Sequence, residues 1–93
     1  MVKTGGKFLI QGTVQGIFFR NFCKEAADSL NLKGYARSLD TGIVEIYAEG
    51  DKENLAKLEA ILKKGPPHAQ IREVKIEEKK WSGEFKDFKV LKF

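Results

Sequence analysis

The order of strand-like and helix-like segments is the feature that most restricts how this chain can fold. Residues 7–14 are apolar and β-branched enough to form a strand, and they run into a glycine-containing turn. From Arg20, apolar residues recur at steps of three and four, which predicts an amphipathic helix that ends before Gly34. The chain therefore opens with a strand followed directly by a helix.

A hairpin and a second helix come next. Residues 35–39 and 43–48 have the composition of two strands, and they flank Asp40-Thr41-Gly42, whose glycine can take the positive φ of a short hairpin loop. Asp51 is placed to cap an amphipathic helix that Gly65-Pro66-Pro67 ends. The first strand–helix pair is thus followed by a hairpin and then by another helix.

The last part of the chain predicts strands over residues 69–79 and 85–93, with a turn at Ser82-Gly83. These segments complete two βαβ-like halves around the hairpin. The order predicts an α+β fold, the ferredoxin-like split βαβ sandwich, with an antiparallel sheet and both helices on one face. With 93 residues, no internal repeat and no linker, we expect a single domain over residues 1–93.

The composition argues against several classes of protein. No run approaches the roughly 18 consecutive apolar residues of a membrane span, and the first residues lack the apolar run of a signal peptide. We therefore expect a cytoplasmic protein without a membrane partner. The single cysteine, Cys23, cannot form an internal disulfide and is expected in the core with Phe8, Phe19, Phe22 and Phe88. No cluster of histidine and cysteine offers a metal site.

The charge pattern fits two kinds of partner. The 17 basic and 13 acidic residues give a net charge of +4, which suits a nucleic-acid binder or an enzyme that attracts a small anion. The two signs are interspersed, as on an ordinary solvated surface. Residues 43–49 also offer one aromatic and two acids, where an RNA-binding domain on this fold stacks bases on several aromatics. We expect a monomer with no nucleic-acid partner.

The segment between the first strand and the first helix is the best candidate for chemistry. Gly12 and Gly16 allow sharp turns, so that successive backbone N–H groups can converge on an anion at the helix N-terminus. Arg20 lies at that point, and its planar guanidinium can donate two parallel hydrogen bonds to phosphate oxygens. On these grounds alone, an anion site and an ordinary surface arginine remain equal alternatives.

A resemblance to a known family separates the alternatives. The residues at 14–20 read V-Q-G-I-F-F-R, which resembles the phosphate-binding signature of the acylphosphatases. The similarity continues, in family order and spacing, through K-G-Y-A-R, D-T-G-I-V-E-I-Y-A-E-G and G-P-P-H-A-Q-I. The resemblance implies hydrolysis of acyl phosphates to a carboxylate and inorganic phosphate, with no metal and no organic cofactor.

The resemblance also implies site residues. Arg20 would bind the phosphate and stabilise the charge that develops in the transition state. The backbone amides that would assist it belong to Gln15, Gly16, Ile17, Phe18 and Phe19.

One expected catalytic position differs from the family. Acylphosphatases usually have G-W-V-R-N where this chain has Gly34-Tyr35-Ala36-Arg37-Ser38, so that a serine replaces the asparagine that orients the attacking water. A hydroxyl is shorter than the amide and lacks its fixed donor–acceptor pair. A water displaced by about 1 Å would slow hydrolysis up to about a hundredfold. We therefore predict slowed hydrolysis, with Arg20 and Ser38 as the catalytic residues.

Two alternatives accompany this prediction. A phosphate-binding module with little or no turnover would keep Arg20 and lose the aligned water. Ser38 acting as a nucleophile is disfavoured, because the single histidine, His68, belongs to a segment that the fold would place away from the loop.

Overall fold

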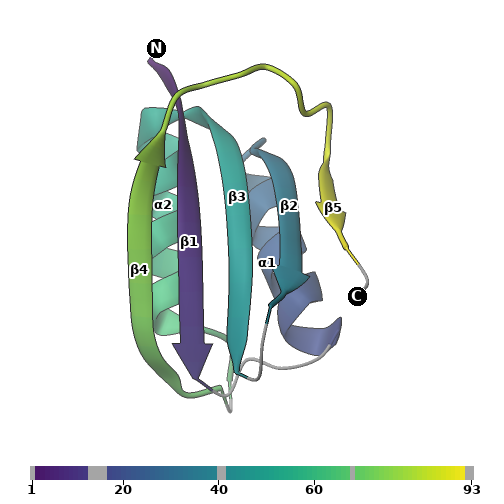
Figure 1. Ribbon diagram of the computed structural model, residues 1–93, viewed down its shortest axis with the longest axis vertical. Coiled ribbons are helices and arrows are strands. Elements are labelled where there is room, and N and C mark those ends of the chain that lie inside the picture. Colours follow the sequence, from purple (N-terminus) through teal and green to yellow (C-terminus); the bar gives the residue numbers. More distant parts are fainter. Residues whose placement is uncertain (1, 13–16, 40–41, 68, 92–93) are drawn as a thin grey trace.

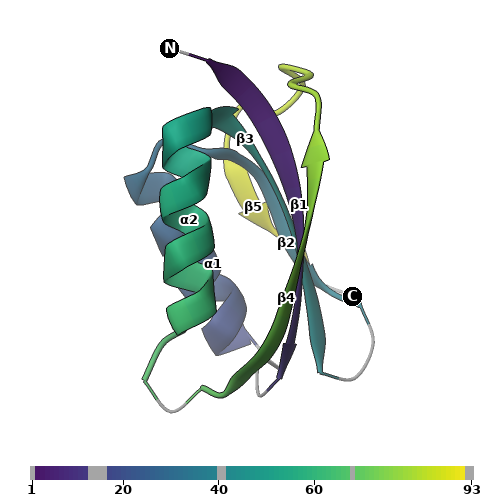
Figure 2. The ribbon, with the colours of Figure 1, turned by 90° about the vertical axis from the view of Figure 1, so that its left-hand side faces the viewer.

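The computed structural model describes residues 2–12, 17–39, 42–67 and 69–91 of the chain. In chain order the elements are β1 (Lys3–Gly12), α1 (Ile17–Ser29), β2 (Lys33–Ser38), β3 (Ile43–Asp51), α2 (Lys52–Lys64), β4 (Ile71–Lys79) and β5 (Phe88–Val90). The five strands form one sheet in the order β4-β1-β3-β2-β5. Both helices cover the same face of this sheet (Figure 1, Figure 2), which confirms the predicted ferredoxin-like sandwich.

The sheet is antiparallel except at one edge. β1 pairs antiparallel with β3 and β4, and β2 pairs antiparallel with β3. The prediction of an antiparallel sheet is wrong for β5, which pairs parallel with β2. After β4, residues 80–87 cross the upper end of the sheet to its other edge, so β5 runs in the same direction as β2 (Figure 1).

The core lies between the sheet and the two helices. Alternate residues of β3, Val44, Ile46 and Ala48, point to the helices and are almost fully buried. The predicted core residues Phe8, Phe19, Cys23 and Phe88 are buried with them, and Phe22 packs partly buried against the cluster. Burial raises the pKa of the Cys23 thiol to about 12, so it remains a protonated, apolar packing group.

The elements begin and end close to their predicted limits, with three differences. β1 starts at Lys3, because Gly5 and Gly6 pair with strands on both sides. α1 begins at Ile17, three residues before Arg20. β5 is confined to 88–90. The predicted cap is confirmed: the Asp51 carboxylate accepts a hydrogen bond of 3.0 Å from the backbone N–H of Glu53.

Candidate functional site

Several elements begin or end together at the lower end of the sheet in Figure 1: β1 and β2 end there, and α1 and β3 begin there. Gly12 closes β1 at a register shift, with φ of 150°, and its N–H donates to the carbonyl of Gly42 over 3.1 Å. A Cβ atom on Gly12 would lie 2.0 Å from the carbonyl oxygen of Gln70. Only glycine therefore fits where the chain leaves β1 toward α1.

Arg20 lies in the first turns of α1 and is half-buried. Its Nη1 donates a hydrogen bond of 3.1 Å to the carbonyl of Leu91, just after β5. The N–H of Leu91 in turn donates to the carbonyl of Ala36 in β2 over 2.9 Å. Leu91 is thereby fixed to β2, and its carbonyl tethers the guanidinium beside the start of α1.

Ser38 is the last residue of β2 and is half-buried. Side chains alternate along a strand, so Ser38 shares a face with Gly34 and Ala36, both buried beneath the helices. Its partner across the β2–β3 pair is the buried Val44. Ser38 therefore lies on the helix-covered face, at the end of the sheet where α1 begins, and the fold brings it to the same end and the same face as Arg20.

The predicted phosphate cradle is described in part. Gln15 and Gly16 lie outside the described residues, as does His68. Ile17, Phe18 and Phe19 form the first turn of α1. The first four N–H groups of an α-helix have no acceptor within the helix, and they point along its axis toward the end that attracts anions. The first turn therefore presents N–H donors at the end of the sheet where Arg20 and Ser38 lie.

Sequence reasoning missed a buried carboxylate on the open face of the sheet. Glu45 of β3 is 2% exposed and accepts from Arg37 Nε at 2.5 Å and pairs with Lys7 Nζ at 3.3 Å. Burial alone would raise the pKa of Glu45, but the hydrogen bonds and charges of Arg37 and Lys7 bring it below its ordinary value. Arg37 is the residue before Ser38, so this ion pair anchors the end of β2.

A second buried carboxylate, Glu49, lies on the same face. It is also 2% exposed, and it accepts hydrogen bonds from the Tyr47 hydroxyl (2.7 Å), the Ser82 N–H (2.9 Å), the Ser82 hydroxyl (2.7 Å) and the Gly83 N–H (3.1 Å). Burial opposes ionisation, yet these donors lower the pKa of Glu49. The period-two spacing of Glu45, Tyr47 and Glu49 is the sequence signal that places all three on one face.

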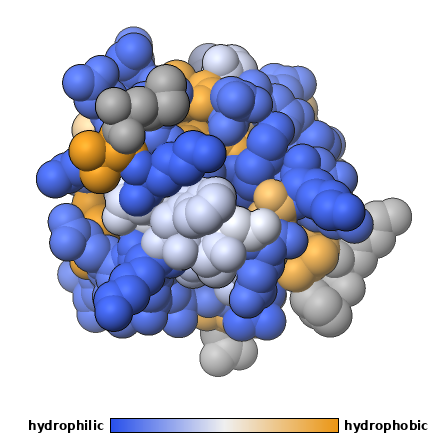
Figure 3. Space-filling model, turned by 90° about the horizontal axis from the view of Figure 1, so that it is seen from above, coloured by the Kyte–Doolittle hydropathy of each residue, from blue (hydrophilic) through white to orange (hydrophobic). Residues whose placement is uncertain are grey.

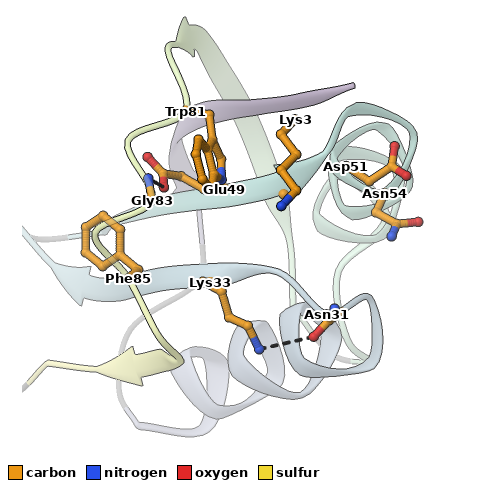
Figure 4. A pocket seen from close by; sticks show the side chains of 10 residues that line it. Lys3, Asn31, Lys33, Glu49, Asp51, Asn54, Trp81, Gly83 and Phe85 are labelled. Atoms are coloured by element: carbon orange, nitrogen blue, oxygen red, sulfur yellow. Dashed lines mark hydrogen bonds between the residues drawn. The ribbon is translucent and has the colours of Figure 1, made fainter. Parts of the chain in front are cut away.

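Glu49 also borders a pocket of about 250 Å³ at the upper end of the sheet, far from Ser38 along the strand (Figure 4). Figure 4 shows Trp81, Lys3 and Lys33 around it. Lys33 Nζ donates to the side-chain oxygen of Asn31 over 3.1 Å, and Lys3 Nζ lies 5.0 Å from the centre of a Trp81 ring. Seen from this end, hydrophilic side chains surround a central area of intermediate hydropathy (Figure 3). The polar side chains around this pocket thus already have partners within the protein.

Among the described residues, no group of three or more histidine, cysteine, aspartate or glutamate side chains is arranged to hold a metal ion. Within the same ranges, no helix is long and apolar enough to cross a membrane.

The fold and the lower end of the sheet define an α/β sandwich with an arginine beside the N-terminus of its first helix. The chain belongs to the acylphosphatase family: the family model described as acylphosphatase matches residues 6–90. An acylphosphatase of Dehalococcoides mccartyi is 41% identical over 85 residues, covering 90% of this chain and 93% of that protein. One of Alkalilimnicola ehrlichii is 47% identical over 70 residues, covering 75% and 79%. The crystal structure of acylphosphatase from Bacillus subtilis matches with a TM-score of 0.90 at 28% identity, covering 96% of this chain and 99% of that one.

Proposed function

We propose that the protein hydrolyses acyl phosphates, with the phosphoryl group bound between Arg20 and the first turn of α1. The observation that carries this proposal is that Arg20, the N-terminus of α1 and Ser38 lie at the same end of the sheet and on the same face. Membership of the acylphosphatase family supports the same reaction. The phosphate-binding amides would be those of residues 15–19.

The reaction is transfer of a phosphoryl group to water. The water oxygen bonds to phosphorus while the bond between phosphorus and the acyl oxygen breaks. The acyl oxygen keeps the electron pair and leaves as a carboxylate, and the water gives up a proton as inorganic phosphate forms. A carboxylate is a good leaving group, so the protein's main tasks are to position the water and to stabilise negative charge on the phosphoryl oxygens.

Ser38 would orient the attacking water in this arrangement. Its place at the end of β2 is fixed by the pairing with Val44 and by the neighbouring ion pair of Arg37 with Glu45. A hydroxyl on this fixed backbone holds a water with less directional control than an amide. We therefore propose that the enzyme turns over more slowly than a variant with asparagine at this position.

The open face of the sheet supports the absence of an RNA-binding role. Tyr35 and Tyr47 stack on each other with ring centres 5.8 Å apart, and Phe85 packs on both. The aromatic rings of the two strands are thus used within the protein, next to the carboxylates of Glu45 and Glu49. The rings are therefore not free to stack on the bases of a single-stranded RNA.

We also propose that the protein acts as a monomer in the cytoplasm. The sequence has a single cysteine, which is buried, so no internal disulfide calls for an oxidising compartment. Sedimentation at several protein concentrations and cell fractionation test the two statements. A concentration-dependent dimer, or recovery outside the cytoplasmic fraction, would contradict them.

The reaction is tested with acetyl phosphate in water labelled with heavy oxygen and in the presence of a metal chelator. We expect release of one phosphate per acetate, competitive inhibition by inorganic phosphate, and the label in the phosphate. Label in the acetate would show attack at the carbonyl carbon and contradict the proposed positioning at phosphorus. Phosphate binding without any turnover would instead identify a binding module.

A further inference from the structure

A groove lies beside the start of α1, on the side of the helix away from Arg20. It has a volume of about 350 Å³. Most of its wall is apolar, with two polar residues at its border; the lining residues are Phe18, Asn21, Phe22, Glu25, Pro66 and Pro67. Phe18 is 81% exposed, the largest fraction among the exposed large hydrophobic residues of the described ranges. Phe18 thus forms part of a contiguous apolar surface with Phe22, Pro66 and Pro67, the kind of surface that marks a ligand-binding groove.

The helix geometry relates the groove to the proposed phosphate site. Phe18, Phe22 and Glu25 are four and then three residues apart, so they form one stripe along α1. Arg20 is two residues after Phe18 and therefore about 200° around the helix axis from it. A phosphoryl group at the N-terminus of α1 would have the guanidinium on one side and the groove on the other.

The segment that follows α2 supplies the opposite wall. α2 ends and α1 begins at the same lower end of the molecule (Figure 2). Gly65, with φ of 73°, ends α2 and accommodates the turn into Pro66 and Pro67. Two adjacent prolines have little conformational freedom, so this apolar wall is held in place before any ligand arrives.

The direction of the reaction points to the occupant. Ser38 lies on the sheet side of α1, and in-line displacement places the leaving acyl oxygen on the side of phosphorus opposite the attacking water. The face of α1 that packs on the core carries Phe19, Cys23 and Ala27. Of the groove stripe, Phe22 packs partly buried against this core, and Phe18 and Glu25 are exposed to solvent. An acyl group that leaves on that side would extend along Phe18.

We propose that this groove binds the acyl group of the substrate, and that the preferred substrates are acyl phosphates with an apolar, uncharged acyl group. The inference rests on the proposed function and adds a specificity determinant to it. Phe18 and Phe22 contact the acyl group through their rings, Pro66 and Pro67 form the facing wall, and the Glu25 carboxylate at the border disfavours acyl groups with a second carboxylate.

The main test compares benzoyl phosphate with acetyl phosphate. Both substrates undergo the same phosphoryl transfer, so the ratio of their kcat/KM values isolates the acyl group. We expect Phe18→Ala to lower this ratio by roughly tenfold and Phe18→Leu to retain most of it, as for loss of a hydrophobic contact in a specificity pocket. Trp81→Ala, which removes an exposed aromatic at the other end of the sheet, should leave the ratio unchanged.

The charge at the border is tested separately. Glu25→Gln should raise kcat/KM for succinyl phosphate relative to acetyl phosphate by about twofold to threefold, because an exposed charge acts weakly through water. Glu84→Gln, an exposed glutamate at the upper end of the molecule, is the matched control. An equal effect of both substitutions would show a general change in charge and contradict a role for Glu25 at the groove.

The proposal for the groove and the proposed function can be overturned independently of each other. An unchanged benzoyl-to-acetyl ratio in Phe18→Ala, with hydrolysis of both substrates intact, overturns the groove proposal alone. If the parent hydrolyses neither substrate, the proposed function fails, and calorimetry with benzoylphosphonate and acetylphosphonate still tests the groove. Tighter binding of the benzoyl compound that is lost in Phe18→Ala supports it, and equal affinities overturn it. A dimer abolished by Phe18→Ala with the ratio unchanged would assign the groove to a second copy of the chain.

Discussion

The two ends of the sheet differ in how their polar groups are held. At the upper end, the Glu49 carboxylate is buried and accepts four hydrogen bonds, and Asp51 caps α2. At the lower end, Arg20 and Ser38 are half-buried, and Phe18 is almost fully exposed. The upper end therefore stabilises the fold, while the lower end keeps polar side chains accessible to a small anion.

This difference has a physical reason. A buried carboxylate contributes to stability only when donors surround it, and those same donors occupy the lone pairs that a ligand would need. A group that must bind phosphate has to remain partly hydrated and within reach. Substitutions at the lower end should consequently change mainly the turnover. Those at the upper end should change mainly the free energy of unfolding.

The largest expected effect is on Arg20. Arg20→Ala should lower kcat/KM for acetyl phosphate by about a hundredfold to a thousandfold, the range for removing one group that stabilises transition-state charge. Loss of the hydrogen bond to Leu91 should cost about 1 kcal/mol of unfolding free energy. Steady-state kinetics and urea denaturation measure the two quantities. Arg72→Ala, an exposed arginine on β4, is the control, and a similar fall in kcat/KM there would reduce the role of Arg20 to attraction by net charge.

The next largest effect is expected at Ser38, where a substitution should raise the activity and not lower it. Ser38→Asn should raise kcat by up to about a hundredfold, because the amide restores a fixed donor and acceptor for the water. The inhibition constant for inorganic phosphate should stay within about twofold, since water positioning and phosphate binding are separate tasks. Ser38→Ala shows what the hydroxyl itself contributes. An unchanged kcat in Ser38→Asn would mean that this position does not limit the reaction.

Substitutions at the upper end should lower the free energy of unfolding and leave the activity nearly unchanged. Glu49→Gln replaces an acceptor of four hydrogen bonds by an amide that also carries donors, which should cost about 2–3 kcal/mol of unfolding free energy. The measurement is urea denaturation at neutral pH, together with kcat/KM, which should change by less than about twofold. Glu77→Gln removes the charge of an exposed glutamate paired with Lys79 and should cost much less unfolding free energy than Glu49→Gln, because ion pairs in water contribute little. A large loss of activity in Glu49→Gln would show that the two ends are coupled.

Local sequence patterns were sufficient to predict most of the fold. Apolar spacing predicts both helices, and an aspartate followed by an amphipathic stretch predicts the cap at Asp51. The parallel edge strand was missed, since its direction depends on the path of residues 80–87 across the sheet. The start of β1 was missed because the glycine pair, Gly5-Gly6, is held as strand by its neighbours on both sides, a tertiary effect that overrides propensity.

The site was predictable only where a motif is contiguous. Arg20 and Ser38 follow from stretches that resemble the family signature, and their roles remain predictions. The donors to Glu49 come from Ser82 and Gly83, more than 30 residues further along the chain, so the sequence alone does not show that the carboxylate is buried. The groove likewise joins the first turn of α1 to Pro66 and Pro67, which meet through the fold.

The smallest expected effect distinguishes the two buried carboxylates by their response to salt. Both pKa values are lowered in the folded state, so each carboxylate stabilises the protein above its unfolded pKa, and this contribution is lost as the pH falls through the folded value. Glu45 is held by the charges of Lys7 and Arg37, which are each about one-third exposed, whereas Glu49 is held by uncharged donors. Adding about 1 M NaCl should therefore reduce the difference in unfolding free energy between the parent and Glu45→Gln by a few tenths of a kcal/mol. The corresponding difference for Glu49→Gln should stay constant, and equal salt sensitivity of both variants would contradict the distinction between charged and uncharged partners.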